Sequence, residues 1–554
     1  MKILLIEIPN SGSRPGYSGL FLPLGLAYVT ASLVGKSDYS FDCISLHTEE
    51  IFSKGEFNPW EQLNNYDFTS YDVVAYGGVF LKFEILKEIS ERVWSANKDI
   101  FQVAGGNMAT TMADVILTQT KVTRICLYEG EQTFIELLSY LKNDGDWRNT
   151  RGIKYLNDQN ELTLTAPREK IKDLDTVAYP DRENWSFDVI RKAFPFGSPG
   201  RYCAVVFASR GCPFSCTFCN PVSGKAIRAR TSENIVSEIK HLKNKWNIQY
   251  FRFFDEVFIG SKRKIYNLCN LIIEEKLNIF WWCQTQIKLV DDELLKLMKK
   301  AGCIEIGYGI ESGSNLILDE MRKGITKELA KDVIEMTERV GIKPSLNMIS
   351  GSPSETYDTL KESRDFLISL NHINWVEIPE INFIVPIPGT VMYESAVSKG
   401  EIKDVEKYLK EDMSRLGKYT RTTNLTKMSD EIFFKSVMKF NEDVVNDFYK
   451  KHPWKKILSI IGLDHLRLDK LFSNFSLRQI RPLLESLAWA TIGKRDNVLG
   501  KFIASIIYKR KSLSTGNGHL HDHYDEARQI SSQDYLHDSQ CLENTIKKQH
   551  IEAS

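Results

Sequence analysis

Residues Ser209–Asn220 read SRGCPFSCTFCN. Within this segment Cys212, Cys216 and Cys219 are spaced CxxxCxxC. Three thiolates this close together must lie on one short loop, because a regular strand or helix would turn at least one of them away. A four-iron cluster is normally held by four cysteines. Three cysteines therefore leave one iron open for a ligand from outside the protein, and Phe218 would shield one side of the cluster.

The cysteine motif has other interpretations. Three thiols can lie near a turn without binding anything, and zinc can bind cysteines together with a fourth Cys or His from elsewhere. Zinc sites more often use paired CxxC motifs, so the spacing favours the cluster. The pattern CxxxCxΦC, in which Φ is aromatic, resembles the radical S-adenosylmethionine (SAM) enzymes. The resemblance implies a [4Fe-4S] cluster whose open iron binds the amino and carboxylate groups of SAM, which is cleaved reductively to a 5′-deoxyadenosyl radical.

The composition is typical of a globular protein with several domains. The chain has 554 residues, a formal net charge of +0, and 42% hydrophobic and 26% charged residues, so we expect about two or three domains. A neutral balance gives no electrostatic reason to expect a nucleic acid or an acidic membrane surface as partner. The ten cysteines are too dispersed for a disulfide scaffold, and an oxygen-sensitive cluster indicates a reducing cytoplasm. No transmembrane segment is expected, because Pro23 and three glycines interrupt the uncharged run Tyr17–Gly35.

Strands alternate with helices in the first 145 residues, 1–145. Such alternation predicts a parallel sheet with helices on both faces, in an α/β fold. A flavodoxin-like (Rossmann-type) strand order is expected, with a ligand at the carboxyl ends of the strands. The apolar runs place strands at Lys2–Ile8, Ser40–Leu46, Tyr71–Tyr76, Phe101–Ala104 and Arg124–Leu127, and helices at Leu24–Val34, Lys82–Ala96, Ala109–Gln119 and Glu131–Leu141.

Glycines follow the last three of these strands, where they let a large ligand approach the backbone. The segments FLPLGLAYVTASL, VAGGNMAT and YEGEQTF resemble the cobalamin-binding domain that precedes many radical SAM domains. The resemblance implies that the VxGGxxxT loop lies against the nucleotide tail of cobalamin. The implied cobalamin contacts are Gly77, Gly78, Gly105, Gly106, Thr110, Glu129 and Gly130.

The domain departs from the older cobalamin-binding pattern in one respect. It has no DxHxxG motif, and His47 is its only histidine. The resemblance therefore implies a cobalt without a histidine lower ligand. The alternative is a domain that has lost its cofactor and serves as a substrate lid, and we favour binding.

A connector and a second series of strand–helix units follow. Residues 146–200 are charged and punctuated by prolines, and they contain a short hairpin made of Arg151–Leu156 and Glu161–Thr165. Residues 201–400 contain six strand–helix units, which predict a partial (β/α)6 barrel related to the TIM barrel, with active groups at the carboxyl ends of the strands. Strands are expected at Tyr202–Ala208, Ile248–Phe254, Ile279–Gln284, Ile304–Tyr308, Lys343–Ile349 and Trp375–Phe383.

Candidate SAM-binding residues stand at several of these strand ends. Asp255 and Glu256 in RFFDEVF could accept hydrogen bonds from the amino group of SAM, or could cap a helix. The motif GIESGS closely resembles the family motif that contacts the ribose and carboxylate of SAM, which implies these roles for Glu311 and Ser312. The motif ISGSPSET resembles GxPGET, which implies that Gly351 shapes the wall near adenine.

Other motifs agree with the family or depart from it. Ser354 replaces a glycine of the GxPGET turn, and Gln286 stands where relatives often have an arginine. The segment PIPGTVMYE, Pro386–Glu394, resembles PxPGTxxY and is expected to close the barrel beside the substrate. Arg228 and Arg230 resemble a basic pair of the family, but we leave them outside the site because such arginines more often form ion pairs.

The C-terminal part of the chain carries fewer signals. Residues 401–511 read as a mostly helical region, in which the apolar positions of Asp430–Tyr449 indicate core contacts. Residues 512–554 read as a flexible polar tail. We expect substrate choice to be encoded in this C-terminal part.

These features together predict a cytoplasmic, cobalamin-dependent radical SAM enzyme that methylates an unactivated carbon of a small-molecule or lipid substrate. An electron donor such as flavodoxin or ferredoxin is the expected partner, and no nucleic acid is expected. The alternatives are a radical SAM cyclase, oxidase or rearrangement enzyme without methyl transfer, and a non-catalytic cobalamin or iron–sulfur binding protein. A methylthiotransferase is disfavoured, because it needs further cluster cysteines and the N-terminal domain contains only Cys43 and Cys126.

Overall fold

The computed structural model describes residues 1–10, 22–52, 57–193, 202–220, 222–375, 377–413, 423–453 and 455–456. The chain divides into a compact unit from Met1 to Phe448 and a second unit from Tyr449 to Ser554. The features that bear on function lie in the first unit. Most of the predicted helical region 401–511 and the whole predicted tail 512–554 lie outside the described residues. Within the described residues, no helix has the length and apolarity that a membrane crossing requires.

The N-terminal domain is built on a sheet of seven strands in the order β2-β1-β3-β4-β5-β6-β7. Its first five strands are parallel, which confirms the predicted flavodoxin-like order. The hairpin predicted in the connector forms β6 and β7 and pairs antiparallel with β5, so it covers what would otherwise be an open edge. The strands are β1 (Lys2–Glu7), β2 (Ser40–Ser45), β3 (Val73–Gly77), β4 (Phe101–Gly105), β5 (Arg124–Cys126), β6 (Ile153–Leu156) and β7 (Leu162–Leu164).

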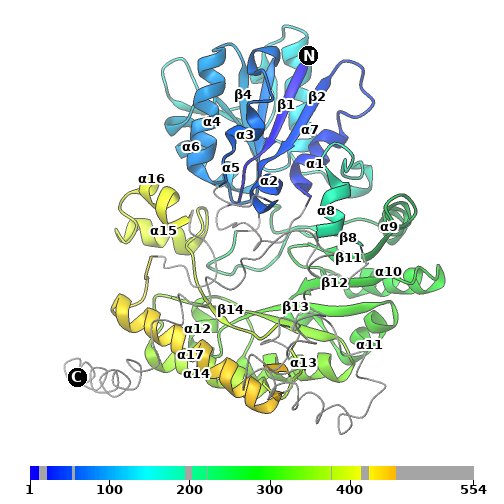
Figure 1. Cartoon of the computed structure of the whole chain (residues 1–554), viewed down its shortest axis with the longest axis vertical. Helices are drawn as coiled ribbons and strands as arrows, with labels where there is room; N and C mark the ends of the chain where they lie inside the picture. Colours follow the sequence, from blue (N-terminus) through cyan, green and yellow to red (C-terminus); the bar gives the residue numbers. More distant parts are fainter. Residues whose placement is uncertain are drawn as a thin grey trace, which may run out of the picture. The chain divides into compact units, whose positions relative to one another are not determined.

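Helices cover both faces of this sheet (Figure 1). The apolar residues of β1 from Ile3 to Ile6 are fully buried, so this strand needs a packed layer on each side. Helix α4 has the matching pattern, because Leu86, Ile89 and Val93 recur at helical spacing and join the same hydrophobic core. The helices are α1 (Leu24–Ala31), α2 (Leu46–Phe52), α3 (Trp60–Leu63), α4 (Phe83–Ala96), α5 (Asn107–Thr111), α6 (Ala113–Gln119) and α7 (Gly130–Lys142).

The second domain contains six parallel strands in the order β8-β11-β12-β13-β14-β15, which confirms the predicted partial (β/α)6 barrel. The strands are β8 (Tyr202–Val206), β11 (Ile248–Phe253), β12 (Phe280–Thr285), β13 (Cys303–Glu311), β14 (Lys343–Ser350) and β15 (Ile381–Phe383). The helices around them are α8 (Phe187–Ala193), α9 (Ser232–Trp246), α10 (Lys262–Glu274), α11 (Asp292–Lys300), α12 (Asn315–Glu320), α13 (Lys327–Arg339), α14 (Tyr357–Leu370), α15 (Val391–Ser398) and α16 (Val405–Lys407).

The strand β15 begins later than its apolar sequence predicts. It pairs with β14 from Ile381, which lies opposite Met348. Helix α17 (Asp430–Lys451) caps this strand start, because its Asn441 side chain accepts a hydrogen bond from the Ile381 N–H at 2.7 Å and donates one to the Ile381 carbonyl at 2.9 Å. The same helix buries Phe433 and Phe440, which confirms its predicted core face.

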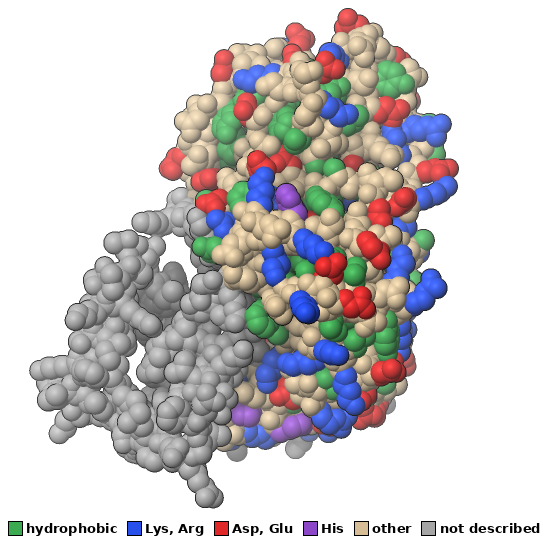
Figure 2. Space-filling view, turned by 90° about the vertical axis from the view of Figure 1, so that its right-hand side faces the viewer, with side chains coloured by type: hydrophobic (Ala, Val, Ile, Leu, Met, Phe, Trp, Pro, Cys, Tyr) green, Lys and Arg blue, Asp and Glu red, His purple; other side chains and the backbone are tan. Residues whose placement is uncertain are grey.

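Charged side chains of both signs are interspersed on the face shown in Figure 2. This pattern agrees with the formal net charge of +0.

Candidate functional site

The cysteine segment follows strand β8 and is held by the barrel around it. Its first residues form the short strand β9 (Ser209–Arg210), which pairs with β10 (Arg228–Ala229). Thr217 donates its N–H to the Met321 carbonyl at 3.1 Å, and its own carbonyl accepts the N–H of Met392 at 3.0 Å. Met321 begins the segment MRKGIT (Met321–Thr326), and Met392 lies in PIPGTVMYE. These two segments therefore fix the loop between its second and third cysteines.

The three thiols influence one another on this loop. Cys212 and Cys216 are half-buried, and Cys219 reaches the surface. The protein around Cys219 nevertheless desolvates its thiol, which raises the pKa to about 11, and charge repulsion from Cys216 and Cys212 adds to the shift. Such a donor set fits a centre that brings positive charge to stabilise the thiolates, as an iron cluster does.

Among the described residues, no three His, Cys, Asp or Glu side chains converge closely enough to hold one metal ion. A [4Fe-4S] cluster binds each cysteine through a different iron, so it takes thiols that surround a larger volume.

The two carboxylates that follow β11 hold the cysteine segment in place. Asp255 is fully buried and accepts hydrogen bonds from the Ser209 hydroxyl at 2.6 Å and the Ala208 N–H at 3.2 Å. Burial raises the pKa of Asp255 to about 6. Glu256 accepts the N–H of Gly211 at 2.6 Å. Both residues therefore position the loop, while their predicted contact with the amino group of SAM stays a prediction.

A buried ion pair lies at the carboxyl end of β13. Glu311 and Lys323 are about equally buried, and Lys323 Nζ lies 2.8 Å from Glu311 Oε1. The same ammonium group lies 5.7 Å from the ring centroid of Phe218 in the cysteine motif. Ser312 is fully buried beside Ser363, with 3.1 Å between their hydroxyl oxygens. Lys323, in the segment MRKGIT (Met321–Thr326), was not among the site residues predicted from the sequence.

The turn after β14 keeps its structure despite the departure from the family motif. The N–H of Gly351 donates to Glu355 Oε2 at 2.7 Å, and burial raises the pKa of Glu355 to about 7. Ser354 donates its N–H to Glu320 at 3.2 Å, and its hydroxyl lies 3.1 Å from the same carboxylate. The serine that replaces a glycine is therefore accommodated by a partner on α12.

Other positions singled out in the sequence lie in buried surroundings. Gln286 is 8% exposed, and its Oε1 has no hydrogen-bond partner in the part of the chain that is described. Arg230 pairs with Glu238 at 2.6 Å, in agreement with its exclusion from the site. Gly389 of the PIPGT turn is in close contact with the cysteine segment, since a Cβ at this position would lie 2.6 Å from Asn220 Nδ2.

A cavity of about 1820 Å³, its open mouth included, lies along the carboxyl ends of β1, β3, β4 and β5. The barrel contributes Ser209, Arg210 and Glu256 to its lining. The cavity therefore reaches from the strand-end glycines to the residues that hold the cysteine segment. Of the predicted cobalamin contacts it is lined by Gly77, Gly78, Gly105, Gly106, Glu129 and Gly130.

The remaining predicted contact, Thr110, is not among the residues that line the cavity, and its contact with cobalamin stays a prediction. Its hydroxyl accepts the backbone N–H of Tyr128 at 2.9 Å. Tyr128 has a left-handed backbone with φ of 61°, lines the cavity and is 53% exposed. Thr110 thus stabilises an unusual backbone conformation beside the cavity.

Two buried polar residues that were not among the predicted contacts also line the cavity. Glu7 at the end of β1 is 4% exposed, accepts a hydrogen bond from Ser45, and has a pKa raised by burial to about 8. His47 is 3% exposed, and burial lowers its pKa to about 4. Its Nδ1 has no hydrogen-bond partner among the described residues. Near neutral pH the side chains of Glu7 and His47 are therefore mainly uncharged. Only the structure reveals this, because it depends on their burial.

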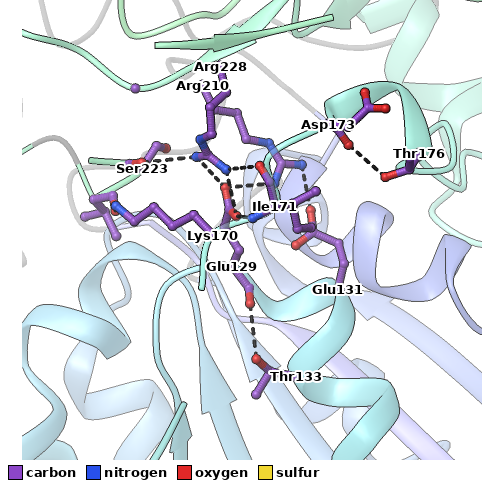
Figure 3. A network of polar contacts seen from close by, with 12 residues as sticks. Glu129, Glu131, Thr133, Lys170, Ile171, Asp173, Thr176, Arg210, Ser223 and Arg228 are labelled. Carbon is purple, nitrogen blue, oxygen red and sulfur yellow. Dashed lines mark hydrogen bonds and ion pairs between the residues drawn. The ribbon is translucent and has the colours of Figure 1, made fainter. Parts of the chain in front are cut away.

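Figure 3 shows a network of ion pairs that joins the N-terminal domain to the strands flanking the cysteine segment. Arg228 forms a bidentate pair with Glu129, at 2.7 and 2.9 Å. Arg210 lies 3.3 Å from Glu129 and 2.6 Å from Glu131. Burial alone would raise the pKa of Glu129, but hydrogen bonds from Arg228 and the Ile171 N–H hold it below its usual value. The Glu129 carboxylate is therefore engaged in the contact between the N-terminal domain and the barrel. Arg228 forms an ion pair, which agrees with its exclusion from the candidate site.

Comparison with known proteins agrees with this arrangement. Residues 206–367 match the family model of the Radical SAM superfamily. The chain therefore contains a radical SAM domain. This radical SAM enzyme is 26% identical over 404 residues to an uncharacterized methyltransferase of Pyrococcus horikoshii, covering 72% of the chain and 83% of the relative. It is 29% identical over 419 residues to the anaerobic magnesium-protoporphyrin IX monomethyl ester cyclase of Rubrivivax gelatinosus, covering 74% of the chain and 72% of the cyclase.

The fold of this radical SAM enzyme is also that of a solved relative. The structure of OxsB, a cobalamin-dependent SAM radical enzyme with aqua-cobalamin and SAM bound, matches with a TM-score of 0.65. The match covers 100% of this chain and 80% of OxsB at 16% sequence identity. At this identity the likeness shows the fold, in which a Rossmann-type domain precedes the partial barrel.

Proposed function

We propose that this radical SAM enzyme binds a [4Fe-4S] cluster, SAM and cobalamin, and that it methylates an unactivated carbon of a small-molecule or lipid substrate. The observation that carries the proposal is the shared cavity. Its lining includes strand-end glycines of the N-terminal domain together with Arg210 and Glu256 beside the cysteine segment. A cofactor on the strand ends and a radical formed at the cysteine loop would thus be confined together, as proximity catalysis requires.

Cys212, Cys216 and Cys219 would hold the cluster. When bound, the [4Fe-4S] cluster supplies the electron that cleaves SAM to methionine and a 5′-deoxyadenosyl radical. The protein contributes a loop whose shape is already fixed. Asp255 holds its start through Ser209, while the barrel segments around it hold Thr217 by backbone hydrogen bonds. Such support keeps the ligands in place without rearrangement on binding.

The residues after β13 and β14 would hold SAM. The Glu311 carboxylate accepts hydrogen bonds only, which suits the two hydroxyl donors of a ribose. Lys323 orients this carboxylate from 2.8 Å away and leaves its second oxygen for a ligand. Ser312 and Gly351 stand at neighbouring strand ends, where they are proposed to contact the carboxylate and the adenine side of SAM.

The N-terminal cavity would hold cobalamin. When bound, cobalamin supplies the methyl group for transfer to a substrate carbon. Gly106 lets the ends of β3 and β4 approach closely beside the cavity, since a Cβ at Gly106 would lie only 2.8 Å from the Gly78 carbonyl oxygen. Glu7 and His47 add uncharged polar groups to the lining, which suit the neutral polar groups of a nucleotide tail.

Anaerobic reconstitution with iron, sulfide and cobalamin tests the proposal. We expect the purified protein to retain one cobalamin per chain by absorption spectroscopy. With SAM and dithionite it should form 5′-deoxyadenosine, and with reduced cobalamin it should convert SAM to S-adenosylhomocysteine. A protein that forms neither product would overturn the proposal.

A second candidate function is radical ring closure or oxidation without methyl transfer. The 29% identity to a protoporphyrin ester cyclase favours it. The same assay separates the two candidates, because only a methyltransferase should yield S-adenosylhomocysteine. Formation of 5′-deoxyadenosine alone would favour the cyclase class.

A further inference from the structure

The cysteine segment reaches the protein surface between its first two cysteines. Pro213 and Ser215 are exposed there. Lys225 donates to the Phe214 carbonyl from one side, and its Nζ lies 3.3 Å from the Ser215 hydroxyl. On the other side, Lys288 Nζ lies 4.5 Å from the ring centroid of Phe214. Two exposed ammonium groups therefore flank the point where the loop meets solvent.

A third lysine extends this charge across an open pocket of about 780 Å³, its open mouth included, whose lining includes Lys170 and Lys225. Lys170 Nζ lies 3.5 Å from the Val222 carbonyl, close behind the cysteine segment. We call Lys170, Lys225 and Lys288 the lysine surface. None of the three has a carboxylate within ion-pair distance among the described residues.

Three acidic groups lie near the lysine surface. Glu169 pairs with Lys172 at 3.1 Å, Glu129 is paired with Arg228, and Glu256, whose charge acts on Lys170, accepts the Gly211 N–H. The lysine surface therefore keeps a net positive charge, although the whole chain has a formal net charge of +0.

We propose that the lysine surface docks an acidic one-electron donor protein, such as a flavodoxin, which reduces the cluster. This inference rests on the proposed function. Each reductive cleavage of SAM consumes one electron: the donor loses it, the sulfur–C5′ bond breaks, and methionine and the 5′-deoxyadenosyl radical form. The donor must therefore approach where the cluster loop is exposed. Unpaired lysines at that point would steer an acidic partner by complementary charge.

Charge reversal with two reductants tests this inference. In Lys170→Glu/Lys288→Glu, Lys225 keeps its contact with the loop. The matched control is Lys361→Glu, an exposed lysine on α14. Formation of 5′-deoxyadenosine is measured with reduced flavodoxin, supplied by NADPH and flavodoxin reductase, and separately with saturating dithionite. We expect the flavodoxin-driven rate of the double variant to fall by about tenfold at low salt, with the dithionite-driven rate unchanged.

Salt provides a second readout. Adding salt should slow the flavodoxin-driven reaction of the wild type and of Lys361→Glu, but should leave the double variant little changed. An unchanged flavodoxin-driven rate in the double variant would overturn the docking proposal. An equal loss with both reductants would also overturn it, because the lysines would then act on the loop or on a substrate. If the wild type forms no 5′-deoxyadenosine even with dithionite, the proposed function itself fails, and the docking inference falls with it.

Discussion

Removing the Glu129 carboxylate should weaken the contact between the N-terminal domain and the cysteine-bearing barrel. In Glu129→Ala, Arg228 loses its bidentate partner at 2.7 and 2.9 Å. Arg210 keeps Glu131 at 2.6 Å, so only one guanidinium is left without a counter-charge. The Ile171 N–H also loses its acceptor.

The size of the effect follows from burial. The side chains of Arg228 and Glu129 are both only 11% exposed. Breaking a buried ion pair from one side costs about 3–5 kcal/mol. Arg228 retains hydrogen bonds to the Ile171 and Ser223 carbonyls, so the lower end of that range applies. A loss of about 3 kcal/mol corresponds to a fall in melting temperature of about 6–12 °C for a domain of about 150–250 residues.

Calorimetry of the protein without cofactors measures this loss without stabilisation by bound ligands. The matched control is Glu88→Ala, which breaks an exposed pair with Arg92 at 3.0 Å in the same domain and should change the free energy of unfolding by less than about 1 kcal/mol. In the double variant Glu129→Ala/Arg228→Met, the loss in the free energy of unfolding should be smaller than the sum of the losses in the two single variants, because no unpaired charge remains. A melting temperature for Glu129→Ala equal to that of Glu88→Ala would refute the role of this network.

Three further predictions concern single groups of the site. Gly106→Val should weaken cobalamin binding by at least about tenfold while iron content is unchanged, because its side chain would meet the Gly78 carbonyl 2.8 Å away; equal cobalamin affinity in a titration would argue against the cavity as binding site. Lys323→Met should raise the Kd for SAM by about tenfold, since Glu311 loses the partner that orients it; an unchanged Kd by equilibrium dialysis would contradict this. The pKa of Glu7 is raised to about 8 in the folded protein. The stability that protonated Glu7 contributes is therefore present at pH values below the pKa of Glu7 in the unfolded chain, and it is lost as the pH rises through the pKa in the folded protein. Between about pH 5 and pH 8 the melting temperature of the wild type should therefore fall more steeply than that of Glu7→Gln, and parallel curves would count against a buried protonated Glu7.

The strand order and the cluster motif could be predicted because both are indicated by residues that lie close together in the sequence. Each core strand is an apolar run such as Ile3–Ile6, and the three cysteines lie within eight residues. The place of the β6–β7 hairpin could not be predicted, because it depends on the edge that β5 leaves open. A hairpin with the same sequence could equally have packed elsewhere in the connector.

The candidate site was predictable in its motifs but not in all of its contacts. Glu129 stands in a cofactor-like segment, yet its partners Arg210 and Arg228 lie 81 and 99 residues further along the chain. Asp255 was considered as a SAM contact or a helix cap, and the structure adds its hydrogen bonds from Ala208 and Ser209, which the sequence did not reveal. Long-range pairing and burial decide such contacts, and neither leaves a signal in the spacing of residues.

The formation of 5′-deoxyadenosine from SAM tests most directly whether the three cysteines hold a catalytic cluster. The anaerobically reconstituted wild type is compared with Cys216→Ala and with the matched control Cys43→Ala, which alters a half-buried thiol of the N-terminal domain. With dithionite as reductant, we expect the wild type and Cys43→Ala to form 5′-deoxyadenosine and Cys216→Ala to form none above background. Equal formation by Cys216→Ala and the wild type would contradict the assignment of the cluster to this loop.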